Sequence, residues 1–265
     1  MGFIDKVTCT SMCARSLVCV GLDTDAAKLP AGLSGSGGVL SFNREIIRAT
    51  SDLVCAYKPN SAFYEALGSE GIAALEMTCG AVPCEIPIIL DVKRGDIGNT
   101  GVKYAEAAYD RFGADAVTVN PYMGFDAVKP FLRPGKCVFV LCLTSNPSSR
   151  DFLFLETDGK PLYERIAQAA VEWAREGEIG LVVGATQPEA LQRIREIVGD
   201  MPLLIPGVGA QGGDLGLVLR GAGGAPGRTI VNISREILYA STEVDYAEAA
   251  RARLLALRDV INGYR

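Results

Sequence analysis

Eight short apolar runs recur along the chain of 265 residues, and segments with the apolar spacing of helices separate them. Nearly every residue within a run is apolar, rather than every second one, which is typical of parallel strands buried on both faces. The runs are Leu17–Leu22, Leu53–Tyr57, Ile86–Val92, Ala116–Val119, Cys137–Leu143, Ile179–Val183, Leu203–Ile205 and Thr229–Ile233. The clearest helical segments are Thr100–Phe112, Tyr163–Arg175, Pro188–Val198 and Tyr246–Ile261.

Strands that alternate with helices predict an α/β fold, and eight such units predict a (β/α)8 TIM barrel that forms a single domain over residues 1–265. A doubly wound open sheet is the alternative. We expect an additional helix at Ile4–Ala14 to cover the bottom of the barrel. Gly32–Gly38 has the composition of a flexible connector. Ser145–Lys160 is long for a loop between a strand and a helix, which is typical of a lid.

The chain contains no histidine, and this excludes several kinds of active site. Ser–His–Asp and Cys–His nucleophiles, HExxH zinc sites and histidine proton shuttles all require that residue. Any chemistry must therefore use lysine, carboxylates, arginine, cysteine, tyrosine or a cofactor. The net charge of −5 argues against a nucleic-acid-binding surface, which needs clustered cations. It leaves room for a small anionic ligand held by a few local cations.

Eight cysteines are present, and no two of them form a CxxC pair. Cys19, Cys55, Cys137 and Cys142 lie within apolar runs, where cysteine behaves as a small hydrophobic residue. We therefore expect reduced thiols in a cytoplasmic protein rather than a disulfide framework, with a zinc cluster as the less favoured alternative. The N-terminus lacks the pattern of a signal peptide, and no apolar run approaches the ~20 residues of a membrane helix.

Polar or charged residues close nearly every predicted strand. In a barrel, function collects at the carboxyl ends of the strands. The residues at these ends are Asp23, Lys58, Asp91 with Lys93, Asn120, Thr144 with Ser145, Thr186, Pro206 with Gly207, and Asn232 with Arg235. Loops are polar in general, and this explains Asn120 and Thr186. It does not explain lysine and aspartate within apolar runs.

Asp91-Val92-Lys93 carries the strongest of these signals. The side-chain period of a strand places Asp91 and Lys93 on one face. Asp96 follows past the strand end, and Lys58 closes the preceding strand, which a right-handed crossover places alongside. The sequence therefore predicts an alternating array of Lys58, Asp91, Lys93 and Asp96 at one end of the barrel. Because desolvating four charges is costly, a catalytic array is favoured over the alternative of a buried salt-bridge network.

A second signal is the segment from Gly207 to Gly212, which matches GxGxxG between a strand and a helical segment. A dinucleotide site would also want an acidic residue about 20 positions later, where this chain has Asn232 and Ser234. We therefore interpret the segment as a cradle for the phosphate of a mononucleotide or sugar phosphate, with Arg235 as its cation. A glycine-rich turn without a ligand is the alternative.

Several segments together resemble orotidine 5′-phosphate decarboxylases, and within that family the longer subgroup that contains VNPYMG. They are AYKPNSAFYE (56–65), LDVKRGDIGNT (90–100), VTVNPYMG (117–124), TSNPSS (144–149) and IPGVGAQGGD (205–214). The resemblance runs from Val20 to about Tyr239. It implies decarboxylation of orotidine 5′-monophosphate to UMP, the last step of pyrimidine synthesis, with no metal and no organic cofactor. It also implies a homodimer with shared active sites.

The resemblance assigns roles to matching residues. Lys58, Asp91, Lys93 and Asp96 correspond to the charged network of the family, with Lys93 as the proton donor to C6 of the pyrimidine. Asp96 and Thr100 would reach the active site of the partner subunit. The substrate would be contacted by Asp23 at the ribose, by Ser145 at the pyrimidine, by Gln211, Arg235 and the backbone near Gly209 at the phosphate, and by Pro206 and Ser234 at the strand ends. Many relatives have Gly-Arg where this chain has Ser234-Arg235.

The implied chemistry agrees with the residues. Loss of CO2 from C6 leaves a carbanion without a good electron sink, so the site must stabilise negative charge by preorganised electrostatics. Flanking carboxylates keep a lysine ammonium charged, and this ammonium can stabilise and then protonate the carbanion. Three alternatives stay open. They are a related metal-dependent sugar-phosphate decarboxylase or synthase that shares D-x-K-x-x-D, a Schiff-base aldolase that uses Lys58 or Lys93, and a nucleotide-binding barrel that has lost catalysis.

Overall fold

The structure is a computed structural model that describes residues 1–208 and 215–264. In these residues eight parallel strands form one sheet with the order β2-β1-β10-β9-β8-β5-β4-β3. The strands are β1 (Val18–Gly21), β2 (Ala56–Lys58), β3 (Ile89–Arg94), β4 (Ala116–Val119), β5 (Cys137–Leu143), β8 (Glu178–Val183), β9 (Leu203–Pro206) and β10 (Thr229–Ile233). Isolated parallel bridges from Tyr57 to Ile88 and from Asn60 to Asp91 join the two end strands. The sheet closes into the predicted barrel, and the alternative of an open sheet is wrong.

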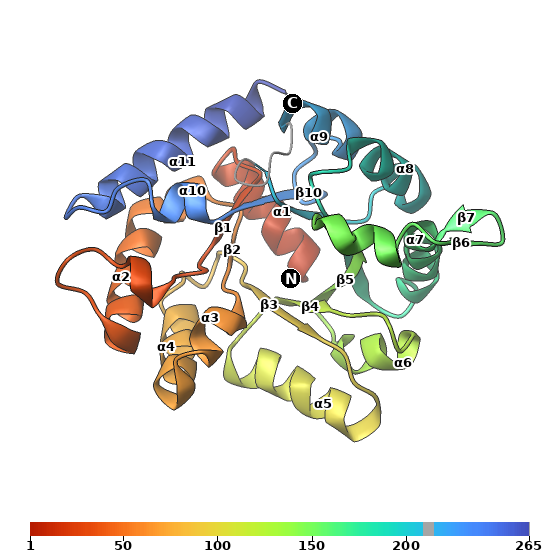
Figure 1. Ribbon diagram of the computed structural model, residues 1–265, viewed down its shortest axis with the longest axis horizontal. Helices are drawn as coiled ribbons and strands as arrows, with labels where there is room; N and C mark the ends of the chain where they lie inside the picture. Colours follow the sequence, from red (N-terminus) through yellow and green to blue (C-terminus); the bar gives the residue numbers. More distant parts are fainter. Residues whose placement is uncertain (209–214, 265) are drawn as a thin grey trace.

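Helices surround the sheet on its outer side, as Figure 1 shows. The longer ones are α2 (Gly35–Thr50), α4 (Gly68–Gly80), α5 (Gly98–Glu106), α7 (Leu162–Trp173), α8 (Pro188–Val198), α9 (Leu215–Ala222) and α11 (Tyr246–Asn262), and the short ones are α3 (Ser61–Glu65), α6 (Phe125–Val128) and α10 (Arg235–Leu238). Helix α8 has the predicted bounds, because Pro188 occupies its first turn and Leu191, Ile194 and Val198 bury one face.

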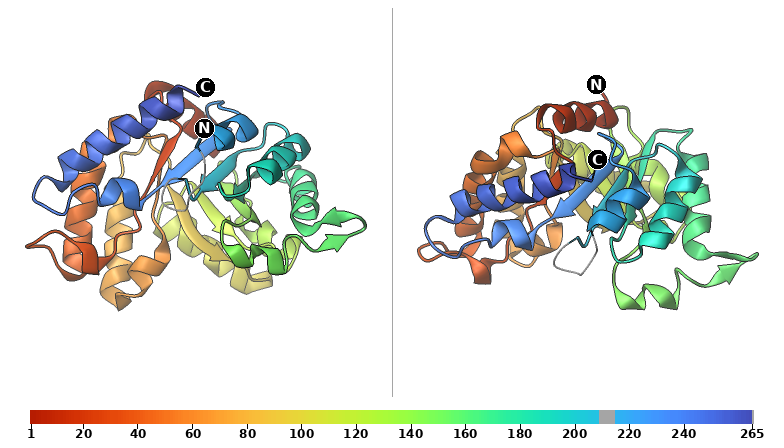
Figure 2. Two further views of the ribbon diagram at one scale, coloured as in Figure 1. Left: turned by 45° about the horizontal axis from the view of Figure 1, so that its top comes forward. Right: turned by 90° about the horizontal axis from the view of Figure 1, so that it is seen from above.

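Helix α1 (Phe3–Cys13) covers the amino ends of the strands, as predicted, and it begins and ends one residue before the predicted bounds Ile4–Ala14. Phe3 and Val7 are buried in the barrel interior. The Phe3 ring packs edge-on against the Phe139 ring, with 5.6 Å between the ring centroids. Figure 2 shows this helix across one end of the barrel. At the opposite end of the barrel, loops follow the carboxyl ends of the strands.

The prediction that Gly32–Gly38 is a connector is wrong for its second half, because α2 begins at Gly35. Burial of Val39 and Phe42 draws the segment onto the barrel. Gly38 packs so closely that a Cβ there would lie 3.0 Å from the backbone of Leu33. Strand β2 also begins later than predicted, since Ser51–Leu53 forms a 3-10 turn.

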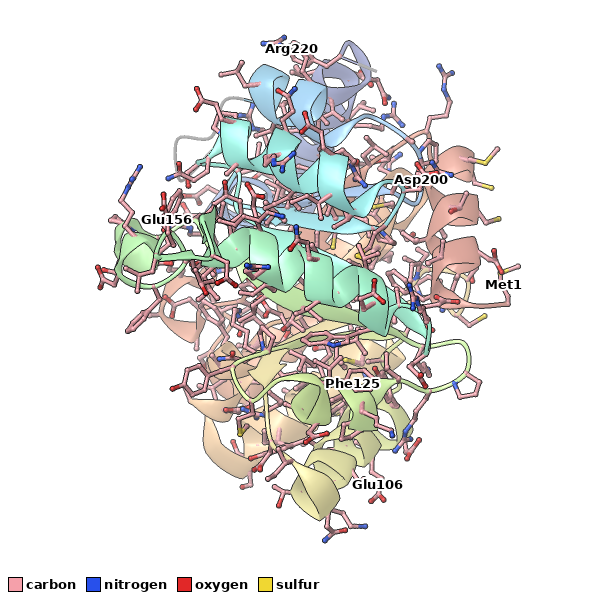
Figure 3. All side chains as sticks on the ribbon, turned by 90° about the vertical axis from the view of Figure 1, so that its right-hand side faces the viewer. Met1, Glu106, Phe125, Glu156, Asp200 and Arg220 are labelled. Atoms are coloured by element: carbon pink, nitrogen blue, oxygen red, sulfur yellow. The ribbon has the colours of Figure 1, made fainter. Side chains whose placement is uncertain are left out.

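The predicted lid Ser145–Lys160 contains regular structure. A 3-10 helix spans Pro147–Asp151, and β6 (Glu156–Thr157) pairs with β7 (Lys160–Pro161) in a small antiparallel hairpin. In Figure 3, Glu156 of this hairpin and Met1 lie at opposite ends of the molecule. The loop thus stands at the end of the barrel away from α1, and its motion stays a prediction.

The cysteines agree with their predicted role as small hydrophobic residues. Cys19, Cys55, Cys137 and Cys142 are buried, all eight thiols are free of disulfides, and Cys79 is buried as well. In the part of the chain that the structure describes, no helix is both long and apolar enough to cross a bilayer.

Candidate active site

Two adjoining cavities open at the carboxyl ends of the strands, with volumes of about 180 and 280 Å³. Both are lined by Lys58, Asp91 and Pro206, so they meet at these residues. The first is also lined by Asp23, Phe63, Asn232, Ser234 and Arg235, and the second by Lys93, Thr118, Leu141, Thr144, Ser145, Asn146, Val182 and Leu204. Eight of the predicted catalytic and substrate-binding residues therefore line these cavities. They are Asp23, Lys58, Asp91, Lys93, Ser145, Pro206, Ser234 and Arg235.

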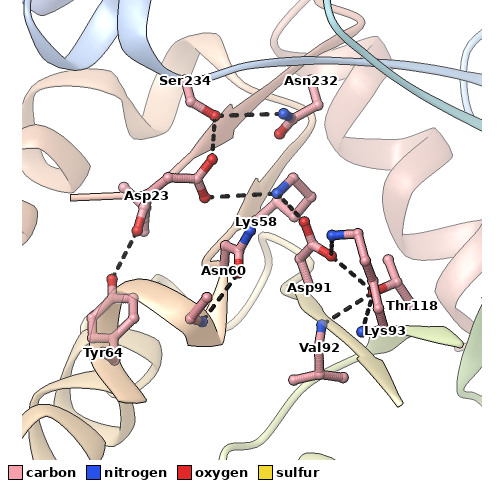
Figure 4. Close-up of polar contacts among 12 residues, drawn as sticks. Asp23, Lys58, Asn60, Tyr64, Asp91, Val92, Lys93, Thr118, Asn232 and Ser234 are labelled. Carbon is pink, nitrogen blue, oxygen red and sulfur yellow. Dashed lines mark hydrogen bonds and ion pairs between the residues drawn. The ribbon is translucent and has the colours of Figure 1, made fainter. Parts of the chain in front are cut away.

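Lys58 lies between two carboxylates. Its Nζ donates to Asp91 Oδ2 at 2.8 Å and lies 3.7 Å from Asp23 Oδ1, and its side chain is only 4% exposed. The strand register places them together, because Gly21 pairs with Lys58 and the next bridge joins Asn60 to Asp91. Figure 4 shows the resulting chain of charges. The predicted neighbourhood of Lys58 and Asp91 is confirmed.

The Asp91 carboxylate and the Lys58 ammonium hold each other in the charged state. Burial alone would lower the pKa of Lys58, but the negative charges of Asp23 and Asp91 outweigh it and raise that pKa above its usual value. Burial alone would raise the pKa of Asp91, but Lys58 and Lys93 outweigh it and lower that pKa well below its usual value. Lys58 and Asp91 therefore stay charged across the neutral pH range.

The lowered pKa of Asp91 predicts that the free energy of unfolding decreases at acidic pH. Because the folded chain binds the Asp91 proton more weakly than the unfolded chain does, the carboxylate stabilises the fold above about pH 4 and loses this contribution as the pH falls further. We expect the free energy of unfolding, measured by denaturant titration, to fall between about pH 5 and pH 2. A Lys58→Met/Asp91→Leu double variant should lose less over that range, and an equal loss in both proteins would contradict the assignment.

Lys93 meets the other oxygen of Asp91. Its Nζ donates to Asp91 Oδ1 at 2.6 Å, and its side chain is 49% exposed. The backbone at Lys93 has a φ of +45°, in the left-handed region, and the pairing of β3 with β4 shifts register between Leu90 and Arg94. The predicted meeting of Asp91 and Lys93 is thus confirmed, but on an irregular strand rather than a regular one.

Thr118 is a site residue that the sequence analysis missed. From β4 its hydroxyl accepts hydrogen bonds from the backbone N–H groups of Val92 and Lys93 and donates to Asp91 Oδ1 at 2.9 Å. The available signal was that Thr118 is the one polar residue of the run Ala116–Val119. Threonine is common in strands, so this signal does not distinguish function from β-propensity.

Asp23 and Ser234 form the edge of the first cavity. Ser234 Oγ donates to Asp23 Oδ2 at 2.8 Å, while Asp23 Oδ1 is buried, has no hydrogen-bond partner among the residues that the structure describes, and faces Lys58. Ser234 lies so close to the backbone of Gly21 that a Cβ on Gly21 would be 1.9 Å from Ser234 Oγ. Arg235 opens α10 beside this cavity.

Asp96 and Thr100 lie apart from the cluster of Lys58, Asp91 and Lys93 in the same chain. Asp96 lies beyond β3 and its Oδ1 accepts a hydrogen bond from the backbone of Ile97 at 2.8 Å. Thr100 lies exposed in the first turns of α5. Neither lines either cavity. Gly209 and Gln211 lie outside the residues that the structure describes.

The profile of the orotidine 5′-phosphate decarboxylase / HUMPS family matches residues 16–251. The chain belongs to this family. It is 51% identical over 271 residues to the curated orotidine 5′-phosphate decarboxylase of Cupriavidus metallidurans, covering 100% of this chain and 99% of that protein. The family membership that the motifs predict is confirmed.

Solved structures of the family share the same fold. The OMP decarboxylase of Leishmania donovani superposes with a TM-score of 0.87 at 38% identity, covering 100% of this chain and 99% of that one. The UMP synthase of the same organism gives a TM-score of 0.89 at 40% identity, and the match covers 100% of this chain and 56% of that longer protein. The cavities at the carboxyl ends of the strands are therefore the candidate active site of a family member.

Proposed function

We propose that this chain converts orotidine 5′-monophosphate to UMP and CO2, the last step of pyrimidine synthesis, without a metal or an organic cofactor. The observation that carries the proposal is the buried carboxylate of Asp91, which binds the ammonium groups of Lys58 and Lys93 through separate oxygens at 2.8 and 2.6 Å. A carboxylate that is saturated by two cations orients both of them and stays charged. This arrangement stabilises negative charge that develops next to Lys93.

The reaction needs one carbon–carbon bond broken and one proton delivered. The bond between C6 and the carboxylate breaks, CO2 leaves, and the electron pair stays on C6. The Lys93 ammonium stabilises this carbanion and transfers a proton from Nζ to C6, which yields UMP. The Lys93 side chain is half exposed, so water can return the proton afterwards. Lys58 is buried between Asp91 and Asp23, and it holds the two carboxylates in position.

The two cavities suit the two ends of a nucleotide. Arg235 lies at the first cavity and supplies a cation for the phosphate, together with Gln211 and the backbone at Gly209. Asp23 lines the first cavity, where its Oδ1, which has no hydrogen-bond partner among the described residues, accepts a hydrogen bond from a ribose hydroxyl. Ser145 contacts the pyrimidine in the second cavity, whose apolar walls include Leu141, Val182 and Leu204. Pro206 lies where the cavities meet.

A homodimer with shared sites completes the charged array. Asp96 and Thr100 do not line the cavities of their own chain, and each would serve the site of the partner subunit. Apolar side chains stand exposed on the neighbouring loops, with Ile97 at 53% and Tyr122 at 93% exposure. Such side chains after β3 and β4 supply apolar area for a second copy of the chain. We assign this enzyme to the cytoplasm and its barrel to a single domain.

Mixing two inactive variants tests the shared sites. Lys93→Ala and Asp96→Ala subunits should each form inactive homodimers, because each site lacks one charged group. In heterodimers one site contains both defects and the other contains none. Random exchange of equal amounts should therefore restore about a quarter of wild-type kcat per site. No recovery after verified subunit exchange would show that Asp96 acts within its own chain or not at all.

The decarboxylase proposal is tested by following the loss of orotidylate absorbance with EDTA present. We expect full activity, because the chemistry resides in Lys93 and its carboxylates. A strict metal requirement would overturn the proposal in favour of a metal-dependent relative. A covalent adduct trapped by borohydride with substrate would favour a Schiff-base aldolase. Binding of UMP without turnover of orotidine 5′-monophosphate would favour a barrel that has lost catalysis.

A further inference from the structure

The Thr118 hydroxyl stands at the centre of the charged cluster but is not itself charged. It is buried, with 2% of the residue exposed. It contacts the backbone nitrogens of Val92 at 3.1 Å and Lys93 at 3.0 Å, and Asp91 Oδ1 at 2.9 Å. Figure 4 shows these three contacts, which join Thr118 of β4 to residues of the neighbouring strand β3. One side chain of β4 thus holds three consecutive residues of β3.

The direction of each hydrogen bond is determined by the chemistry of a hydroxyl. A hydroxyl has one proton and two lone pairs, and a backbone N–H is a donor only. The N–H groups of Val92 and Lys93 therefore occupy both lone pairs, and the proton must point at Asp91. No hydrogen-bonding capacity remains for a substrate, although Thr118 lines the second cavity. Its influence on the reaction must pass through Asp91 and Lys93.

The backbone that Thr118 holds is strained. Lys93 has a φ of +45°, and the left-handed region is unfavourable for a residue with a Cβ because the Cβ lies too close to the following carbonyl oxygen. Such conformations persist only where the surroundings hold them. The hydroxyl of Thr118 satisfies the N–H groups of the two consecutive peptide units that flank Val92, at the shift in register between Leu90 and Arg94. Without it, two N–H groups would lose their partner and the segment could relax.

We propose that Thr118 is a positioning residue for proton delivery: it fixes Asp91 and the irregular turn of β3, and so aims the Lys93 ammonium at C6. The proposal rests on the proposed function, because it concerns the step in which Lys93 acts. It predicts an effect on the chemical step and not on nucleotide binding, since the groups assigned to phosphate and ribose lie on other strands.

Three variants separate this role from packing. Thr118→Val keeps the shape and removes the hydroxyl, while Thr118→Ser keeps the hydroxyl and removes the methyl group. Thr229→Val is the matched control, because Thr229 is another buried strand threonine, whose hydroxyl bonds to the backbone of Ala222 and Gly223 outside the cavities. If Thr118→Val does not fold, Thr118→Ala removes the same hydroxyl without a new methyl group and is judged by the same criteria.

We expect kcat of Thr118→Val to fall by about tenfold to a hundredfold, with KM for orotidine 5′-monophosphate and Kd for UMP within about threefold of wild type. Thr118→Ser and Thr229→Val should keep kcat within about threefold. A second readout is the exchange of the C6 hydrogen of UMP with deuterium in D2O, followed by NMR. This exchange is the proton transfer run in reverse, and it should slow in Thr118→Val by a similar factor.

The proposal is overturned if Thr118→Val keeps wild-type kcat and exchange rate, or if Thr118→Ser loses as much as Thr118→Val. A loss confined to KM and UMP binding also overturns it, because that pattern places Thr118 in substrate binding. Failure of the proposed function is distinguishable, since the wild-type protein would then not decarboxylate orotidine 5′-monophosphate at all.

Discussion

The Lys93→Ala variant should bind UMP as wild type does and lose kcat by about a thousandfold or more. Removing a positioned general acid typically costs 10²–10⁴-fold, and here the same ammonium also stabilises the carbanion. Binding should persist because the cavity beside Arg235 and Asp23 does not include Lys93. Steady-state decarboxylation and calorimetric titration with UMP measure the two quantities separately.

A lysine–aspartate pair at the other end of the barrel provides the control. Lys6 Nζ lies 2.8 Å from Asp115 Oδ2, nearly the same spacing as in the active site. Lys6→Ala removes an equivalent ammonium and should leave kcat unchanged. If Lys93→Ala retains more than about a tenth of wild-type kcat, Lys93 is not the proton donor.

The free energy of unfolding of the Asp91→Ala variant should be about 3 kcal/mol lower than that of wild type, and the variant should be inactive. The reason is that Lys58 is buried and, among the residues that the structure describes, would keep only Asp23, at 3.7 Å, as a carboxylate partner. Breaking one half of a buried ion pair is costly because an uncompensated charge is left behind. Denaturant titration measures the change, with the slope checked for two-state behaviour.

Two further variants test the cause of this loss. Lys58→Met/Asp91→Leu removes both buried charges and should recover most of the stability without any activity. Glu172→Ala breaks the pair with Arg175, in which the Glu172 side chain is 60% exposed, and should cost less than about 1 kcal/mol. Equal losses in Asp91→Ala and Glu172→Ala would contradict the assignment of a buried charge network.

The fold was predictable because burial on both faces leaves a direct record in the sequence. The bounds of β4, β5 and β10 agree with the apolar runs, since every residue of those runs except the half-buried Leu141 is buried. The prediction failed where apolar residues pack outside a strand. Leu53 and Val54 are buried, yet they precede β2, so their hydrophobicity extended the predicted strand too far toward the N-terminus.

The charged part of the site was predictable for a related reason. Lysine and aspartate are costly within buried strands, so Lys58, Asp91 and Lys93 stood out against their surroundings. Thr118 did not stand out, because threonine is common in strands whether or not its hydroxyl contributes to a functional site. The left-handed backbone at Lys93 leaves no signal either, because no glycine marks it and the hydrogen bonds that hold it come from another strand.

The central claim is that the Asp91-bound ammonium of Lys93 supports decarboxylation without a metal. The most direct measurement uses metal-stripped wild-type protein in D2O with substrate labelled in the carboxylate. The account predicts one labelled CO2 released for each UMP formed, with a single deuterium at C6 of that UMP. Release that depends on an added metal ion, or no release of CO2 from a folded protein that binds UMP, would contradict it.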